Sequence, residues 1–194
     1  MAQGKLIVIS APSGCGKTTI AKAILAKYPA MLFSISATTR LIRNGEVNGK
    51  DYFFLSEQEF QECIQNGDLA EWEEIFGNYY GTLKSEINRA LQQGKVMLFD
   101  VDVKGALSIK RNYPKDSILI FIKPPGLDTL KKRLENRNTE NMEMLKRRLN
   151  RVPMELEQEP EFDYQVMNDD LQKAIDEVDE IVRTNFKSSI QSQS

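Results

Sequence analysis

The chain alternates continuous apolar runs with segments in which apolar residues recur at helical spacing. Four apolar runs and a weaker fifth predict strands, at residues 6–9, 31–36, 96–101, 117–122 and 163–167. Helical spacing predicts helices between most of them, at residues 17–27, 83–92, 103–111, 127–136 and 170–185. Because the four strong runs are mainly apolar, without regular alternation of apolar and polar residues, we expect their strands to be buried on both faces. Strands that alternate with helices predict an α/β fold with a central parallel sheet.

Two segments interrupt this alternation. Residues 38–82 are polar and contain several glycines, with short aromatic pieces such as residues 52–55 that resemble strands. Residues 137–157 are charged or polar around sparse methionine and leucine. We therefore expect a core with two excursions. The expected division is core 1–37, inserted subdomain 38–92, core 93–136, second excursion 137–157, and core with a C-terminal tail 158–194.

The composition narrows the class of protein. A chain of 194 residues with 41% hydrophobic residues is long enough for one α/β domain with small insertions. Its net charge of −2 provides no general attraction to nucleic acid or anionic membranes. Two distant cysteines without metal-ligand spacing indicate a reducing compartment, and no apolar run approaches the length of a membrane span. Since a signal-peptide pattern is also absent, we expect a cytoplasmic protein without nucleic-acid or membrane partners.

The segment Ala11-Pro12-Ser13-Gly14-Cys15-Gly16-Lys17-Thr18 has the features of a phosphate-binding loop. It follows an apolar strand and precedes a predicted helix, which is the context that the motif requires. Backbone N–H groups and the positive end of the helix can converge on an anion, Lys17 adds a mobile charge, and the Thr18 hydroxyl can ligate magnesium. The alternative is an ordinary turn with a surface lysine, which the strand–loop–helix order disfavours. We predict a nucleoside triphosphate site, with Ala11 where the first glycine is usual.

A carboxylate ends the apolar strand 96–100. Asp100 is the expected partner of a phosphate loop, because strand ends place an acidic group near the magnesium ion. The Asp102 side chain points to the same side as that of Asp100 only if the chain stays extended between them. One of the two carboxylates then serves the metal or water, and the other serves the substrate. The chain contains no histidine, but phosphoryl transfer depends mainly on positioning and charge stabilisation.

Basic residues gather in and before the second excursion. They are Lys131, Lys132, Arg133, Arg137, Lys146, Arg147, Arg148 and Arg151. One interpretation is a pair of amphipathic surface helices whose charges are solvated. Beside a phosphate loop, arginines on a polar segment also suit a closing lid, because they neutralise the transferring phosphate and can withdraw to release product.

Residues 36–52 predict a second phosphate site. Arg40 and Arg43 precede a glycine turn and Tyr52, so two charges and a hydroxyl can hold a smaller phosphate. The Thr-Thr-Arg-x-x-Arg-x-Gly-Glu pattern of this segment is similar to that of the guanylate kinase family. The resemblance covers nearly the whole chain, through Glu71-Trp72, Gly77-Asn78-Tyr79-Tyr80-Gly81-Thr82 and Asn168-Asp169-Asp170.

The chemistry of guanine gives this resemblance a physical basis. A carboxylate such as Glu71 can accept hydrogen bonds from N1–H and from the N2 amino group, while the Ser36 and Thr82 hydroxyls can donate to O6. Adenine has an acceptor at N1 and no amino group at C2, so it would leave the carboxylate unpaired. The alternative is that Glu71 is an exposed acid within the acidic run 71–74.

The resemblance implies a P-loop NTPase fold with a GMP-binding subdomain, residues 38–92, and a lid, residues 137–157. It implies transfer of the γ-phosphoryl group of ATP to GMP, and to dGMP, with Mg²⁺ as cofactor. The implied ATP-binding residues are Ala11, Pro12, Ser13, Gly14, Cys15, Gly16, Lys17, Thr18, Thr19, Arg133, Asn168 and Asp169. The implied GMP-binding residues are Ser36, Arg40, Arg43, Tyr52, Glu71, Tyr80, Thr82 and Asp102. The implied catalytic residues are Lys17, Arg43, Arg137 and Arg148, and the implied magnesium ligands, directly or through water, are Thr18 and Asp100.

Two other classes of protein share parts of this pattern. Scaffold proteins carry guanylate-kinase-like domains that bind phosphorylated peptides without catalysis. Such domains usually lack a working phosphate loop, whereas Gly14, Gly16, Lys17 and Thr18 are all present here. A GTP-driven switch would carry an Asn-Lys-x-Asp motif, which the chain lacks. We therefore predict a nucleoside monophosphate kinase, with the non-catalytic binding domain as the alternative.

Overall fold

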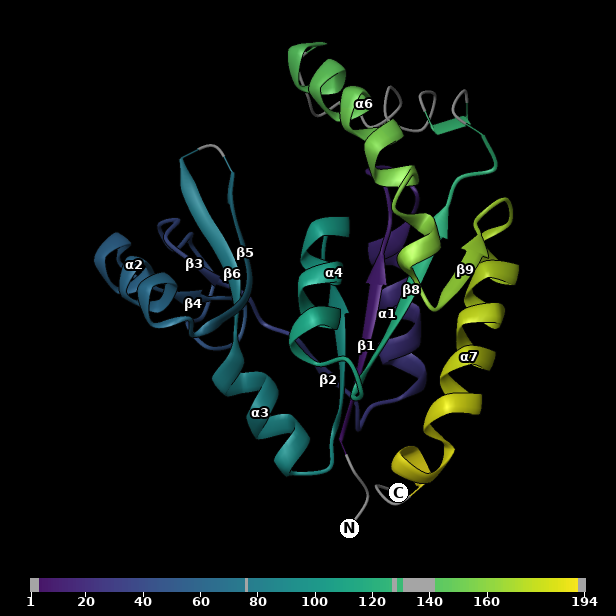
Figure 1. Ribbon diagram of the computed structural model, residues 1–194, viewed down its shortest axis with the longest axis horizontal. Coiled ribbons are helices and arrows are strands. Elements are labelled where there is room, and N and C mark those ends of the chain that lie inside the picture. The colour runs from purple at the N-terminus through teal and green to yellow at the C-terminus, as the bar shows by residue number, and fades with distance from the viewer. Residues whose placement is uncertain (1–3, 76, 127–128, 131–141, 192–194) are drawn as a thin grey trace.

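The computed structural model describes residues 4–75, 77–126, 129–130 and 142–191. Two sheets lie side by side, and helices cover them (Figure 1). The five-stranded sheet has the order β2-β7-β1-β8-β9 and the four-stranded sheet the order β4-β3-β6-β5. The strands of the first sheet are β1 (Lys5–Ser10), β2 (Leu32–Phe33), β7 (Val96–Asp100), β8 (Ser117–Lys123) and β9 (Tyr164–Met167). Those of the second are β3 (Ala37–Thr38), β4 (Phe53–Phe54), β5 (Leu69–Ile75) and β6 (Asn78–Leu83).

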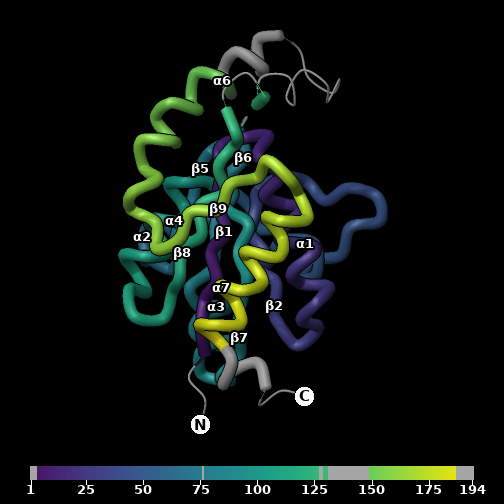
Figure 2. Tube along the Cα trace, turned by 90° about the vertical axis from the view of Figure 1, so that its right-hand side faces the viewer, coloured from purple at the N-terminus to yellow at the C-terminus, as the bar shows by residue number. Residues whose placement is uncertain are grey.

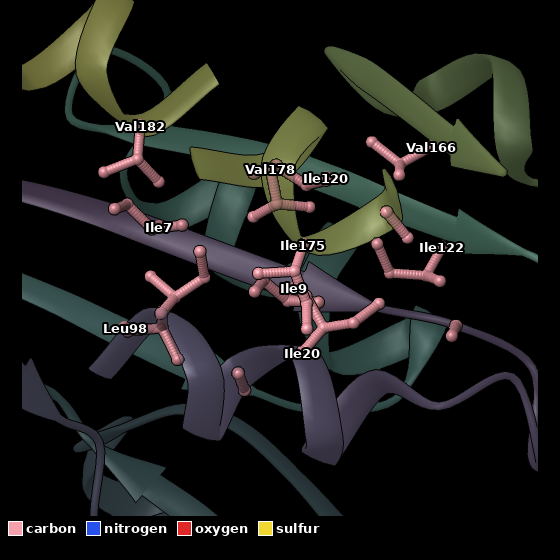
Figure 3. Packing of buried hydrophobic residues seen from close by; sticks show 14 of the residues in the cluster. Ile7, Ile9, Ile20, Leu98, Ile120, Ile122, Val166, Ile175, Val178 and Val182 are labelled. Atoms are coloured by element: carbon pink, nitrogen blue, oxygen red, sulfur yellow. The ribbon is translucent and has the colours of Figure 1, made fainter. Parts of the chain in front are cut away.

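The five-stranded sheet is parallel throughout, which confirms the fold class expected from the alternating pattern. Its helices are α1 (Lys17–Lys27), α3 (Lys84–Gln92), α4 (Val103–Asn112) and α7 (Leu171–Gln191). Figure 2 shows α4 and α1 on opposite sides of the strands. Because successive side chains of β1 point to opposite faces, Ile7 and Ile9 pack with α1 and α7 (Figure 3), while Leu6 and Val8 pack with α3 and α4.

One predicted strand is wrong in length and burial. Residues 31–36 were expected to form a strand buried on both faces, but β2 contains only Leu32 and Phe33. Phe33 is 47% exposed. The reason is that β2 pairs only with β7 at the sheet edge, and the chain then leaves to form β3 in the second sheet. An apolar run cannot reveal which strand takes the edge position.

The inserted segment forms the second sheet with its own small core. The β5–β6 hairpin is antiparallel, and Phe60 of α2 (Glu57–Asn66) packs under it with Ala37 and Leu69. Helix α2 was not predicted, although Ser56 and Glu59 form a capping box that the sequence displays. The aromatic piece at residues 52–55 does become a strand, β4.

Helix predictions agree closely for α1, α3, α4 and the start of α7. The predicted helix 127–136 lies almost entirely outside the described residues. Two further elements are the helix α6 (Met142–Leu156), which projects beyond the sheet (Figure 1), and a 3₁₀ turn, Glu159–Glu161. Val152 of α6 is buried in the same core cluster as Ile9, so this end of the helix is anchored. In the described part of the chain, no helix has the length and apolarity needed to cross a membrane.

Candidate active site

The phosphate loop connects β1 to α1. Gly14 and Gly16 have φ values of 90° and 86°, a region that side chains with a Cβ rarely adopt. The N-cap residue of α1 is Gly16, which has no side chain to accept a hydrogen bond from the first N–H groups of the helix. Such a helix start attracts an anion such as phosphate. Ala11 is buried in the core cluster beneath the loop.

Asn168 supports the loop from the core side. It is 3% exposed, and its Nδ2 donates to the carbonyl oxygen of Cys15 at 2.7 Å. A Cβ on Gly16 would lie 2.5 Å from the same nitrogen, so the close approach requires glycine. Asp169, the other residue expected near adenine, is exposed. The structure therefore ties Asn168 to the backbone of the phosphate loop.

Three expected residues meet at the start of α1. The Lys17 ammonium lies 2.7 Å from Asp100 Oδ1 and donates to the Val101 carbonyl at 2.7 Å. The Thr18 hydroxyl donates to Asp100 Oδ2 at 2.7 Å. Asp100 is the last residue of β7, the neighbour of β1, so parallel pairing brings it to the loop. The carboxylate thus contacts both the mobile cation and the candidate metal-binding hydroxyl.

A second group of polar residues lies between β5, β6 and α4. Thr82 stands opposite Glu71 in the β5–β6 ladder, and its hydroxyl donates to Glu71 Oε1 at 2.6 Å. Asp102 caps α4, accepting from the Gly105 N–H at 2.7 Å. Burial raises the pKa of Glu71 from 4.5 to about 7, so Glu71 is not the exposed acid that the acidic run allowed.

Gly105 provides the space in which these carboxylates lie. A Cβ at this position would be 3.1 Å from Glu71 Oε2 and 3.1 Å from Asp102 Oδ1. Such distances are shorter than ordinary van der Waals contact. No sequence motif marks this glycine, and only its place in the first turn of α4 reveals the contact.

Arg40 is held in a fixed orientation. Its two terminal nitrogens donate to the Glu46 carboxylate at 3.1 Å and 2.8 Å, and its guanidinium lies 5.2 Å from the centre of the Tyr52 ring. Tyr52 and Tyr80 are in edge-to-face contact at 6.2 Å. Glu46 also accepts from the Arg43 N–H at 2.8 Å, which closes the loop. Hydrogen bonding to Arg40 lowers the pKa of Glu46, a positioning residue that was not among the predicted site residues.

The remaining predicted residues are placed less closely. Arg43 is exposed, and Ser36 is half-buried just before β3, with its carbonyl accepting from the Phe53 N–H at 2.9 Å. Arg133 and Arg137 lie outside the described residues. Arg148 belongs to α6, and its side chain is also outside the description.

A cavity of about 670 Å³ opens between the phosphate loop and the β5–β6 hairpin. It is lined by residues 11–19, by Glu73, Glu74, Ile75 and Gly77 from the hairpin, and by Asp102, Arg151 and Glu155. Arg151 Nη2 donates to Glu73 at 3.0 Å and lies 3.4 Å from Asp102 Oδ2. In the sequence, Arg151 is one of several basic residues, and its contacts cannot be read from spacing because they join three separate segments.

Comparison with known proteins agrees with this geometry. The model of the family described as guanylate kinase matches residues 3–185. Guanylate kinases from Chlorobium luteolum and Salinibacter ruber are 47% and 48% identical, covering 97% and 91% of this chain and 95% and 94% of their own. The crystal structure of guanylate kinase from Anaplasma phagocytophilum superposes with a TM-score of 0.71 at 30% identity, covering 94% of this chain and 86% of that chain.

Proposed function

Because the chain belongs to the guanylate kinase family, we propose that the site described above phosphorylates GMP. The protein is a nucleoside monophosphate kinase that transfers the γ-phosphoryl group of ATP to GMP, giving ADP and GDP. The observation that supports the site assignment is the position of the Glu71–Thr82–Asp102 group beside the cavity of the phosphate loop. Asp102 of this group lines the same cavity as the phosphate loop, which supports our proposal that guanine and the triphosphate bind in one site.

Each group has a distinct role in this proposal. Lys17 and the start of α1 hold the β- and γ-phosphates, while Arg40, Arg43, Tyr52 and Tyr80 hold the phosphate of GMP. Glu71 accepts from N1–H and N2–H of guanine, and Thr82 keeps the carboxylate in place. Both phosphate chains are anionic, so catalysis depends on bringing cations to them and excluding water. We assign Arg43, Arg137 and Arg148 to that task.

We also propose that residues 38–92 act as the GMP-binding subdomain and residues 137–157 as the lid. Within the first of these ranges, Ile87 and Ala90 of α3 pack in the main core, so this helix joins the subdomain to the core. A cytoplasmic location is proposed from the two widely spaced cysteines, both of which are free thiols.

The residues at the loop fit a magnesium ion. Mg²⁺ prefers hard oxygen ligands and is usually held by one or two protein groups together with phosphates and water. The Thr18 hydroxyl and the Asp100 carboxylate converge at 2.7 Å and supply such oxygens. When bound, the ion would neutralise charge on the β- and γ-phosphates. The chain's own part is to hold these two oxygens beside Lys17.

An ADP-release assay tests the proposed function. The full chain is incubated with ATP and magnesium, and with GMP, dGMP, AMP, CMP or UMP in turn. We expect release above the acceptor-free control with GMP and dGMP only. A protein that binds GMP in calorimetry but releases no ADP would instead be the non-catalytic binding domain.

The pH dependence of GMP affinity should report Glu71. Its pKa of about 7 lies above the ordinary 4.5, so the Glu71 carboxyl of the ligand-free protein is largely protonated below pH 7. Guanine requires the ionised acceptor, so GMP affinity should fall up to about tenfold per pH unit as the pH drops below 7. In the ligand-free protein, the raised pKa of Glu71 contributes to the folding stability. This contribution is fully present below pH 4.5 and is lost as the pH rises through 7. Calorimetry between pH 6 and 8.5 measures the binding.

The Glu71→Gln variant is the control for this pH dependence. The GMP phosphate itself titrates near pH 6, and the variant retains that contribution alone. Equal slopes of affinity against pH for the wild type and the variant would contradict the assignment of Glu71 to the guanine base.

Replacing Gly105 with alanine should separate stability from GMP binding. Alanine in a helix is favoured over glycine by about 1 kcal/mol, so thermal unfolding should not shift downward. The added Cβ would lie 3.1 Å from both Glu71 Oε2 and Asp102 Oδ1 and displace them. We expect KM for GMP to rise severalfold, with KM for ATP unchanged. The exposed neighbour Lys104→Ala should change neither, and an unaltered KM for GMP in Gly105→Ala would refute the role.

A further inference from the structure

We propose that Arg151 is a positioning residue that couples the two nucleotide sites, an inference that rests on the proposed function. Its Nη2 lies 3.0 Å from Glu73 Oε1 and 3.4 Å from Asp102 Oδ2, and its Nε lies 3.9 Å from Glu155 Oε1. Glu73 belongs to β5, Asp102 begins α4, and Arg151 and Glu155 belong to α6. One guanidinium therefore joins three segments at the edge of the cavity.

The contacts of Arg151 lead directly to the guanine side of the site. Glu73 lies two residues after Glu71 on β5, so both side chains point to the same face of the strand. Asp102 is held at both oxygens, by the Gly105 N–H at Oδ1 and by Arg151 at Oδ2. Gly105 in turn adjoins the Glu71 carboxylate. Moving Arg151 would thus disturb two carboxylates that adjoin Glu71.

The same side chain leads to the ATP side. Arg151 lines the cavity together with the phosphate loop. It follows Arg148 by three residues, which is nearly one helical turn of α6. Val152 anchors this part of α6 in the core, and Leu149 and Leu156 pack against the same cluster. A triphosphate that contacts Arg148 would therefore act on the same part of α6 that holds the guanidinium of Arg151 against Glu73 and Asp102.

Charge explains why an arginine is needed here. Among the described residues that line the cavity, the cations are Lys17 and Arg151, whereas Glu73, Glu74, Asp102 and Glu155 are acidic. The Glu155 Oε2 atom is buried without a hydrogen-bond partner in the described part of the chain. Without Arg151, the carboxylates would repel one another and the anionic GMP. Arginine suits this position because its planar fork can contact several carboxylates.

The effect of an ATP-site ligand on the affinity for GMP tests this role. Isothermal titration calorimetry measures the Kd of GMP with and without the β,γ-methylene analogue of ATP and magnesium. We expect the analogue to tighten GMP binding at least about fivefold in the wild type, within the usual range of allosteric coupling, and less than about twofold in Arg151→Met. KM for GMP should rise about tenfold in the variant, while kcat falls by less than about tenfold.

Two variants make the test specific. Arg151→Lys keeps the charge but loses the fork, so it should retain an intermediate coupling, and it replaces Arg151→Met if that variant does not fold. Arg183→Met removes an arginine of α7 that pairs with Asp179 at 3.1 Å, and it should couple like the wild type.

Three results would overturn the proposal. They are an uncoupled wild type, unchanged coupling in both Arg151 variants, and a fall in kcat above about a hundredfold with KM for GMP unchanged. The last result would make Arg151 a direct phosphate ligand. None of them would affect ADP release by the wild type with GMP, so the proposed function is judged separately.

Discussion

Lys17→Ala is expected to lower kcat at least about a thousandfold while the protein remains folded. The ammonium sits at the start of α1, 2.7 Å from Asp100, where an incoming triphosphate would exchange that ion pair for phosphate oxygens. Alanine is the best helix former, so α1 should persist. Asp100 keeps the hydrogen bond from Thr18, which limits the loss of folding free energy to about 1–2 kcal/mol.

ADP release and thermal unfolding measure the two effects of this substitution. The matched control is Lys22→Ala, because Lys22 is an exposed lysine in the same helix. The control should retain wild-type turnover. Near-normal kcat in folded Lys17→Ala would show that the phosphate loop does not depend on this cation.

Glu71→Gln should raise KM for GMP by about a hundredfold or more, with KM for ATP changed less than about threefold. Glutamine turns one acceptor oxygen into an amide donor, which then faces a donor of guanine. A site built to hydrogen-bond a substrate can reject an unmatched partner by about four to five powers of ten, and this single change removes part of that discrimination. The Thr82 hydroxyl can still donate to the amide oxygen, so the local structure should survive.

Unfolding experiments test independently whether the ionised Glu71 carboxylate lowers the folding stability. Burial raises the pKa of this carboxyl to about 7, so ionised Glu71 opposes folding at pH 8. Glutamine carries no charge, and the variant should be at least as stable as the wild type at that pH. Glu57→Gln, at an exposed position in α2, controls for the loss of a negative charge. Equal increases in KM for GMP and ATP would argue against contact between Glu71 and the base.

The phosphate loop shows what a local pattern can reveal. Its strand, glycines and helix are adjacent in the chain, and the left-handed φ values of Gly14 and Gly16 depend on residues within the loop itself. The helix predicted at residues 17–27 matches α1 at both ends. Local sequence therefore carried the prediction of the loop and of α1. Arg40, Tyr52 and Tyr80 also lie together, but the pairing of β6 with β3 brings Tyr80 to this place.

Other parts of the site depend on contacts between distant segments. Glu71 could be an exposed acid until the β5–β6 register places Thr82 opposite it and α4 brings Gly105 against it. Arg151 meets Glu73 and Asp102 across 78 and 49 residues of chain. No spacing rule predicts such contacts, because they follow from how the two sheets and α6 are placed.

By itself, the sequence determined the parallel α/β core, the phosphate loop and, through its motifs, the family. These features come from periodicity and short-range backbone geometry, which neighbouring residues specify. Only the tertiary structure decided that residues 31–36 yield a short edge strand, that Glu71 is partly buried with a raised pKa, and that Arg151 joins three segments. Burial and charge pairing depend on which distant surfaces meet, and that is a property of the packed fold.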